Sequence, residues 1–209
     1  MEPYYQDDYV TLYHGDCIEV DAWLTADVLV TDPPYGVEWR QSFGDNRHKR
    51  TRPVTVVKNV IKNDDSTDTR DNALTLWGKR PAIVFGSWRM PRPPGAKHIL
   101  IWHKAGAFAG VRSGHPFISN HEEVYVLGDG WVSNGKPLYS VMTTTEARHV
   151  AVQQIGHPTP KPVGLMEQLI ERCPPGVIAE PFAGSGATLL AARNLGRKVI
   201  GVELEEKYC

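Results

Sequence analysis

Short runs of apolar and β-branched residues alternate along this chain with segments whose apolar residues recur at helical spacing. The patterns are typical of strands at 10–13, 27–31, 82–85, 99–103, 123–127, 176–179 and 198–202, and of helices at 71–79, 162–173 and 185–195. Such alternation predicts an α/β fold, a mostly parallel sheet with helices on both faces, because parallel strands need long crossover connections. Residues 128–156 show little periodicity, so we expect an irregular insert there.

Length and composition favour one compact domain. The chain has 209 residues, of which 41% are hydrophobic and 22% charged, enough for one sizeable core but not for two. We therefore expect a single α/β domain spanning 1–209. Cys17, Cys173 and Cys209 are far apart and form no CxxC pair, which argues against a disulfide framework or a zinc site. The acidic N-terminus and the lack of a long apolar run predict a cytoplasmic protein without a membrane partner.

A glycine-containing turn at 180–186 separates a predicted strand from a predicted helix. Gly184 and Gly186 would let a ligand approach the backbone, and the following helix N-terminus favours an anionic group. Glu203 ends the next strand, close to where a doubly wound fold places a carboxylate for ribose hydroxyls, roughly 20 residues on. These features favour a nucleoside-bearing cofactor, although such a turn can also be purely structural. Leu189 replaces the third glycine of the dinucleotide pattern, which disfavours NAD and FAD.

The second motif is Asp32-Pro33-Pro34-Tyr35, at the carboxyl end of a predicted buried strand. An aromatic amine is a poor nucleophile because its lone pair is delocalised into the ring. The Asp32 carboxylate and the Pro33 carbonyl could each accept one amine hydrogen and aim the nitrogen lone pair at a methyl donor. The prolines would hold these acceptors rigidly, and the Tyr35 ring could stack on an extruded base. The alternative is a simple strand-terminating turn.

A cluster of cations follows this tetrad. It comprises Arg40, Arg47, His48, Lys49, Arg50, Arg52, Lys58 and Lys62, opposed only by Asp45. Because the net charge is −1, affinity for nucleic acid must come from such a local patch. We expect a DNA-facing loop at about 38–68, with phosphate contacts from Arg40, Arg47, Lys49, Arg50 and Arg52. A solvated surface loop is the alternative.

The order of these motifs resembles that of the DNA amino-methyltransferases with circularly permuted motifs, the beta group. The similarity extends over 15–17, 31–36, 101–104, 121–123, 157–162, 181–186 and 201–203. It implies a Rossmann-like methyltransferase fold, circularly permuted, with a mostly parallel seven-stranded sheet. It also implies methyl transfer from S-adenosylmethionine to the exocyclic 6-amino group of adenine, in a base flipped out of double-stranded DNA. The insert at about 128–156 would be a small target-recognition region.

The resemblance also assigns roles to individual residues. Asp16 and Cys17 should lie by the adenine ring of the cofactor, Lys161 by its methionine carboxylate and Glu203 on its ribose hydroxyls. The family usually has Asp where this chain has Glu180, a change that we expect to be tolerated. The expected cofactor contacts are Asp16, Cys17, Asp32, Lys161, Glu180, Phe182, Ala183, Gly184, Ser185, Gly186 and Glu203, and the expected catalytic residues are Asp32, Pro33, Pro34 and Tyr35. No metal is expected, because the sulfonium donor is already activated.

Partners and competing activities remain open at this point. Because the insert is small, we expect a short recognition site, a contribution from the basic loop, or a homodimer. The resemblance admits a cognate restriction nuclease or an orphan enzyme, encoded by a bacterium or a phage. Methylation of the 4-amino group of cytosine is an alternative, although such enzymes more often carry Ser in place of Asp32. An inactive cofactor- or DNA-binding module is another. Carbon-5 cytosine methylation is disfavoured, because no cysteine follows a proline.

Overall fold

The computed structural model describes residues 1–39, 61–105, 119–133, 135, 137–144, 157 and 159–209. The strands are β1 (Tyr5–Gln6), β2 (Val10–His14), β3 (Val28–Thr31), β4 (Ala82–Gly86), β5 (His98–Lys104), β6 (His121–Leu127), β7 (Val141–Thr144), β8 (Ile178–Glu180) and β9 (Val199–Glu203). The helices are α1 (Asp68–Trp77), α3 (Val163–Ile170), α4 (Ala187–Asn194) and the 3-10 helices η1 (Ala22–Thr25) and η2 (Glu206–Tyr208). The strands and helices expected from the sequence are thereby confirmed to within a few residues.

The strands form one sheet in the order β1-β2-β9-β8-β3-β4-β6-β5-β7. Strands β2, β9, β8, β3 and β4 pair in parallel, and β6 is antiparallel to both of its neighbours. The expected mostly parallel sheet is confirmed, but within the described residues it has nine strands in place of seven, because β1 and β7 extend its edges. Strand β7 also corrects the expectation of a wholly irregular insert at 128–156. Its Val-Met-Thr-Thr sequence is too short to show a period among the flanking polar residues.

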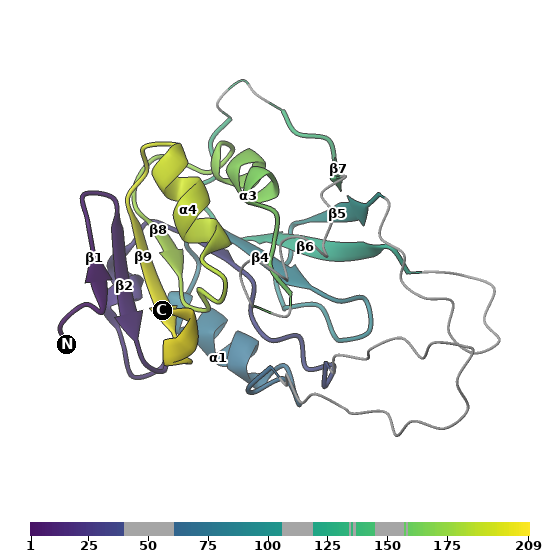
Figure 1. The fold of residues 1–209 in the computed structure, drawn as a ribbon. Helices are drawn as coiled ribbons and strands as arrows, with labels where there is room; N and C mark the ends of the chain where they lie inside the picture. Colours follow the sequence, from purple (N-terminus) through teal and green to yellow (C-terminus); the bar gives the residue numbers. More distant parts are fainter. Residues whose placement is uncertain (40–60, 106–118, 134, 136, 145–156, 158) are drawn as a thin grey trace, which may run out of the picture.

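Helices cover both faces of the sheet, so successive residues of β3 are buried against different layers (Figure 1). Val28 and Val30 pack in the cluster with α3 and α4, whereas Leu29 packs in the cluster with η1 and α1. Each such fully buried side chain contributes about 1.5–3 kcal/mol to folding. In the second layer, the Trp23 and Trp77 rings stack with centroids 5.8 Å apart. Across the described ranges, no helix is long and apolar enough to cross a membrane.

The order in which successive strands are added to the sheet changes direction between the neighbouring strands β3 and β8. Strand β3 leads through α1 to β4 on one side, and β8 leads through α4 to β9 on the other. Helices α1 and α4 cover opposite faces of the sheet (Figure 1). The carboxyl ends of β3 and β8 therefore flank the kind of crevice in which ligands of open α/β sheets bind.

Candidate active site

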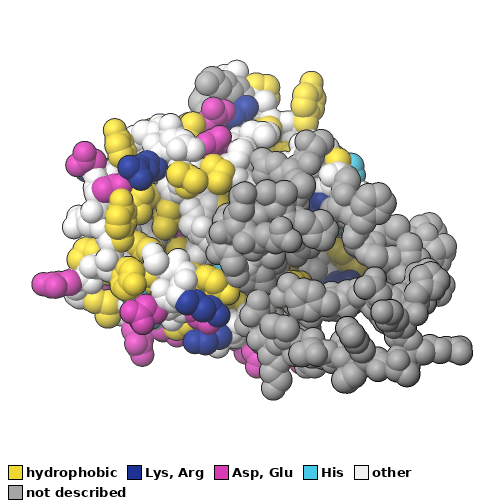
Figure 2. Space-filling model, in the orientation of Figure 1, with side chains coloured by type: hydrophobic (Ala, Val, Ile, Leu, Met, Phe, Trp, Pro, Cys, Tyr) yellow, Lys and Arg dark blue, Asp and Glu magenta, His cyan; other side chains and the backbone are white. Residues whose placement is uncertain are grey.

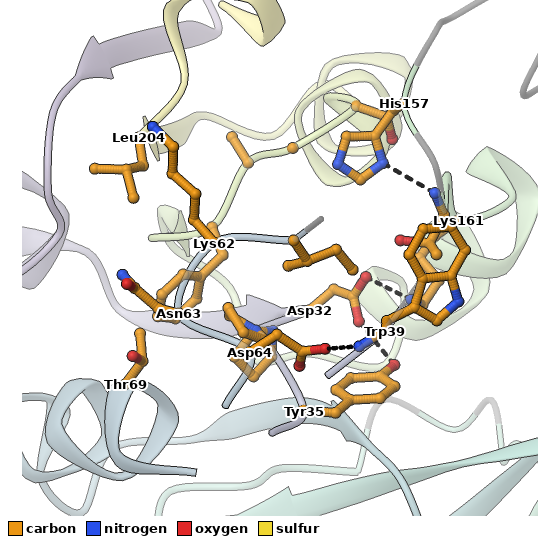
Figure 3. Close-up of a pocket in the computed structure, with 18 of the residues that line it drawn as sticks. Asp32, Tyr35, Trp39, Lys62, Asn63, Asp64, Thr69, His157, Lys161 and Leu204 are labelled. Carbon is orange, nitrogen blue, oxygen red and sulfur yellow. Dashed lines mark hydrogen bonds and ion pairs between the residues drawn. The ribbon is translucent and has the colours of Figure 1, made fainter. Parts of the chain in front are cut away.

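A pocket of about 310 Å³ lies at the carboxyl ends of β2, β3, β8 and β9, within the size range of small-molecule sites (Figure 3). Of the residues singled out in the sequence, it is lined by Asp16, Cys17, Asp32, Pro33, Pro34, Tyr35, Lys161, Glu180, Phe182, Ala183, Gly184, Ser185 and Glu203. Gly186 is not among the lining residues and instead caps α4, with a left-handed φ of 76°. The structure therefore brings together motifs that are far apart in the sequence.

Asp32 directly follows β3, where the first of two prolines ends the ladder for lack of an N–H group. The Tyr35 hydroxyl donates to Asp32 Oδ1 at 2.8 Å, and Lys161 Nζ donates to Oδ2 (Figure 3). Burial raises the pKa of the Asp32 carboxyl, and the Lys161 ammonium opposes that shift. Burial and the neighbouring carboxylates raise the pKa of Tyr35 well above its usual value, so the phenol remains a donor.

Glu122 adds a second carboxylate to this group. The Tyr35 hydroxyl lies 2.9 Å from Glu122 Oε2, Lys161 Nζ lies 3.5 Å from the same oxygen, and Lys104 Nζ donates to Oε1. Burial acts to raise the pKa of Glu122, but the two ammonium groups outweigh it and lower the pKa to about 2. The sequence motifs included Glu122 and Lys104 without a role, because only the antiparallel pairing of β5 with β6 brings these two side chains together.

Lys161 lies between the two carboxylates, and its side chain is only 7% exposed. Its Nζ is also 5.4, 5.1 and 5.9 Å from the ring centroids of Tyr35, Phe85 and Trp102. Burial would lower the pKa of this ammonium, but Asp32 and the second carboxylate raise it, so it stays charged. The resemblance placed Lys161 by the methionine end of a cofactor, whereas the structure shows it in contact with the tetrad.

The glycine turn is bonded to Glu203, and the Glu203 carboxylate is buried next to the turn. The Gly184 N–H donates to Oε2 at 2.6 Å and the Glu205 N–H donates to Oε1 at 2.8 Å. Burial raises the pKa of Glu203. A Cβ at Gly184, where φ is +49°, would lie 3.1 Å from His157 Nε2, so the turn excludes a side chain there. Burial lowers the pKa of His157 to about 4, and its ring packs against Tyr208 with centroids 4.7 Å apart.

Glu180 connects three elements from within the pocket wall. The Thr31 hydroxyl and the Phe182 N–H donate to its Oε1, the latter at 3.1 Å, and the Thr188 hydroxyl donates to Oε2 at 2.7 Å. Burial raises the pKa of this carboxyl to about 8. Glu180 was expected to contact a cofactor, and in the structure both of its oxygens have protein partners, from β3, the glycine turn and α4.

Asp16 and Cys17 form the end of the pocket next to β2. Asp16 Oδ1 accepts the Ile18 N–H at 2.9 Å, and the Cys17 carbonyl accepts the indole N–H of Trp23 at 2.8 Å. Burial raises the pKa of the Cys17 thiol to about 12, so it is neutral near pH 7. The second bond fixes Cys17 against the second layer of the core, and the first holds Asp16 in a local turn.

The outer wall of the pocket comes from residues that the sequence motifs did not single out. They are Val37, Trp39, Ile61, Asn63, Asp64, Thr69, Ser87, Trp88 and Arg89. Lys62, from the basic run, joins them, but Arg40, Arg47, Lys49, Arg50 and Arg52 lie outside the described residues. Among described residues, no three or more His, Cys, Asp or Glu side chains are grouped so as to hold a metal ion.

Comparison with known proteins identifies the chain's relatives. A family model described as DNA methylase, of the N6 and N4 type, matches residues 96–209. The chain is 30% identical over 212 residues to YubD of Escherichia coli (strain K12), described as a methylase, covering 93% of this chain and 84% of that protein. It is 27% identical over 256 residues to the type II methyltransferase M.ScaI of Streptomyces caespitosus, covering 99% and 81%.

Solved structures show the same fold. The M1.HpyAVI–SAM complex superimposes with a TM-score of 0.63 at 21% identity, covering 95% of this chain and 96% of that one. The cytosine-N4-specific PvuII DNA methyltransferase gives a TM-score of 0.62 at 15% identity, covering 99% and 86%. At these identities the likeness establishes the methyltransferase fold predicted from the order of the motifs.

Proposed function

This chain belongs to the DNA methylase family of amino-methyltransferases, and from that premise we propose that it methylates the 6-amino group of adenine in double-stranded DNA, with S-adenosylmethionine as donor. The observation that carries the proposal is the position of Asp32 and Tyr35 in one pocket with the glycine turn. Asp32 itself favours adenine, because the cytosine enzymes of this kind more often carry Ser there. Methylation of the 4-amino group of cytosine is the second candidate, since the PvuII enzyme has the same fold.

The pocket residues fit S-adenosylmethionine, which, when bound, supplies a methyl group that its sulfonium has already activated. The backbone N–H groups of Gly184 and Glu205 bond to Glu203, and a carboxylate offers about four acceptor positions, so it can still accept bonds from ribose hydroxyls. Asp16 and Cys17 would hold the adenine ring, and residues 182–186 the ribose and methionine. Gly184 lines the pocket itself, which supports this assignment, because a residue without a side chain lets a ligand approach the backbone closely.

The residues of the tetrad would prepare the amine for methyl transfer. Lys161 helps to keep Asp32 ionised despite burial, so that the carboxylate can accept one amine hydrogen. The Pro33 carbonyl would accept the other, which directs the nitrogen lone pair out of conjugation with the ring. Once the new N–C bond has formed, the nitrogen must lose a proton, and Asp32 is placed to take it. Tyr35 would hold Asp32 in place through its hydroxyl and the flipped base through its ring.

DNA contacts are proposed for the basic loop at about 38–68 and for the insert at about 128–156. On the described part of the face shown in Figure 2, acidic and basic side chains are intermingled on the side of β1 and β2. The mixed charges on this face do not favour contact with the phosphate backbone of DNA. The proposed phosphate contacts are Arg40, Arg47, Lys49, Arg50 and Arg52. A homodimer and a cognate restriction nuclease are further proposals that rest on the family resemblance.

The substitution Asp32→Ala tests the proposed chemistry. A hydrogen-bond acceptor that acts on the reacting amine contributes mainly in the transition state, so turnover should fall about 100-fold or more. The affinity for S-adenosylmethionine should stay close to the wild-type value. The measurement is transfer of labelled methyl groups to unmethylated DNA, with cofactor binding followed by calorimetry. The exposed Asp68→Ala is the matched control, and near wild-type turnover in a folded Asp32→Ala protein would refute the mechanism.

A further inference from the structure

The Asp64 carboxylate organises the turn that follows the tetrad. Its Oδ1 accepts the N–H groups of Gly36 at 2.7 Å and Val37 at 3.4 Å, and its Oδ2 accepts that of Trp39 at 2.7 Å (Figure 3). Its backbone carbonyl accepts the N–H of Glu38 at 2.7 Å. Four consecutive N–H groups therefore converge on one residue, which is only 4% exposed.

The turn needs this support because its backbone is unusual. Gly36 has φ +79°, and a Cβ there would lie 2.6 Å from the carbonyl carbon of Ser66. Glu38 has φ 48°, a left-handed conformation that side-chain-bearing residues rarely adopt. In the described part of the chain, the hydrogen-bond partners of the Asp64 carboxylate are all backbone N–H groups of this turn. Because the hydrogen bonds of this buried carboxylate go to the backbone, the carboxylate fixes the path of the chain through the turn.

The path of the chain matters because it ends at the pocket. The turn begins immediately after Tyr35, and its last residue, Trp39, lines the same pocket with a partly exposed side chain. Asp64 follows residues 40–60 in the sequence, so its bonds join two distant parts of the sequence at the outer wall. Figure 3 shows the Trp39 indole on the same side of the pocket as Tyr35 and Lys161. An aromatic ring at this position offers a stacking surface to an aromatic base.

We propose that Asp64 is a positioning residue that fixes Trp39 at the pocket wall, where the indole ring stacks on the extruded target base. This inference rests on the proposed function, because it requires a base to enter the pocket. It assigns Trp39 to substrate binding and Asp64 to an indirect role through the backbone of residues 36–39. Neither residue would contribute to holding the methyl donor.

The first test is the substitution Asp64→Asn, which keeps the size of the side chain but loses an acceptor oxygen. The KM for DNA should rise about 10-fold, the effect of losing a hydrogen bond to a charged acceptor, whereas the KM for S-adenosylmethionine should stay within about twofold. A general loss of structure would change both constants and the melting temperature. The exposed neighbour Asp65 provides the matched control, Asp65→Asn, which should leave both constants unchanged.

The second test asks whether Asp64 acts through Trp39. Trp39→Ala should also raise the KM for DNA about 10-fold, because stacking is lost. Trp39→Phe keeps an aromatic ring, so its KM for DNA should be much closer to the wild-type value. If the two residues act as one unit, the double variant should be no worse than Trp39→Ala alone. Independent effects would multiply to about 100-fold, and that result would overturn the proposal.

The remaining outcomes separate this inference from the proposed function. A wild-type protein that transfers no methyl group to DNA would refute the proposed function itself. An active wild-type protein whose DNA KM is unchanged by Asp64→Asn would overturn only the positioning role. Trp39→Ala removes no hydrogen bond of the turn, so it remains informative where Asp64→Asn does not fold. An unchanged DNA KM in that variant also overturns the inference.

Discussion

Glu180 and Glu122 both lie on the wall of the pocket, but their carboxylates have different partners. Hydroxyl and N–H groups surround Glu180, and burial raises its pKa to about 8. Two ammonium groups contact Glu122, and they lower its pKa to about 2 in spite of burial. The comparison shows that neutral donors satisfy a buried carboxylate without offsetting its loss of solvation, whereas ammonium groups keep it charged.

The partners of the carboxylates also differ between the two halves of the pocket, although burial raises the pKa of both Glu203 and Asp32. On the side of the glycine turn, Glu203 has backbone N–H partners and burial raises its pKa. On the side of the tetrad, Asp32 shares Lys161 with Glu122. The first half suits recognition of neutral hydroxyl groups, and the second supplies the fixed negative charge that an amine hydrogen requires. We expect substitutions in the two halves to differ in kind as well as in size.

The largest effect should follow Lys161→Met, which removes the ammonium shared by Asp32 and Glu122. Removing one partner of a buried ion pair leaves the other charge buried and unpaired, so the free energy of unfolding should fall by about 3–5 kcal/mol. The pKa of Asp32 should rise, so the acid limb of the pH–rate profile for methyl transfer should move to higher pH. Lys104→Met is the control, because this lysine bonds to Glu122, whereas the ammonium that opposes the raised pKa of Asp32 is that of Lys161. An acid limb that moves equally in both variants would remove the distinction between the lysines.

A smaller effect, in stability alone, should follow Glu180→Gln. A carboxyl whose pKa is raised from 4.5 to about 8 on folding binds its proton more tightly in the folded state, so it makes stability fall as pH rises between these values. Glu180→Gln should remove this dependence, which is on the order of a few kcal/mol. Thermal unfolding of both proteins between pH 5 and pH 8 measures it. Parallel curves for the two proteins would show that Glu180 does not titrate in this range.

The smallest effect should follow Glu203→Ala on the side of the glycine turn. Loss of the carboxylate removes the proposed bonds to the ribose hydroxyls and should weaken S-adenosylmethionine binding by about 1–3 kcal/mol. Turnover at saturating cofactor should change much less, because this residue has no contact with the tetrad in the described bonds. Calorimetry gives the affinity, and the exposed Glu206→Ala serves as the control. Unchanged affinity in a folded variant would contradict the assignment of Glu203.

The fold was predictable because its central strands are continuous apolar runs. Residues 28–31 are buried on both faces as β3, and the turns after β3 and β8 carry recognisable motifs. Strand β7 was missed, because only one of its four residues, Met142, is buried, which is too few to show an alternating pattern. The contacts of Glu122 and Asp64 could not be read from the sequence, since they depend on strand pairing and on a turn closed by a distant residue.

The central claim is that Asp32 and its neighbours direct methyl transfer to the 6-amino group of adenine. The most direct measurement incubates the wild-type protein with labelled S-adenosylmethionine and unmethylated DNA, digests the product to nucleosides and separates them by mass spectrometry. The account predicts label in N6-methyladenine, and label lower by about 100-fold or more in the same digest from Asp32→Ala after equal incubation. Label in N4-methylcytosine would contradict the adenine assignment, and label in neither base would contradict the proposed activity as a whole.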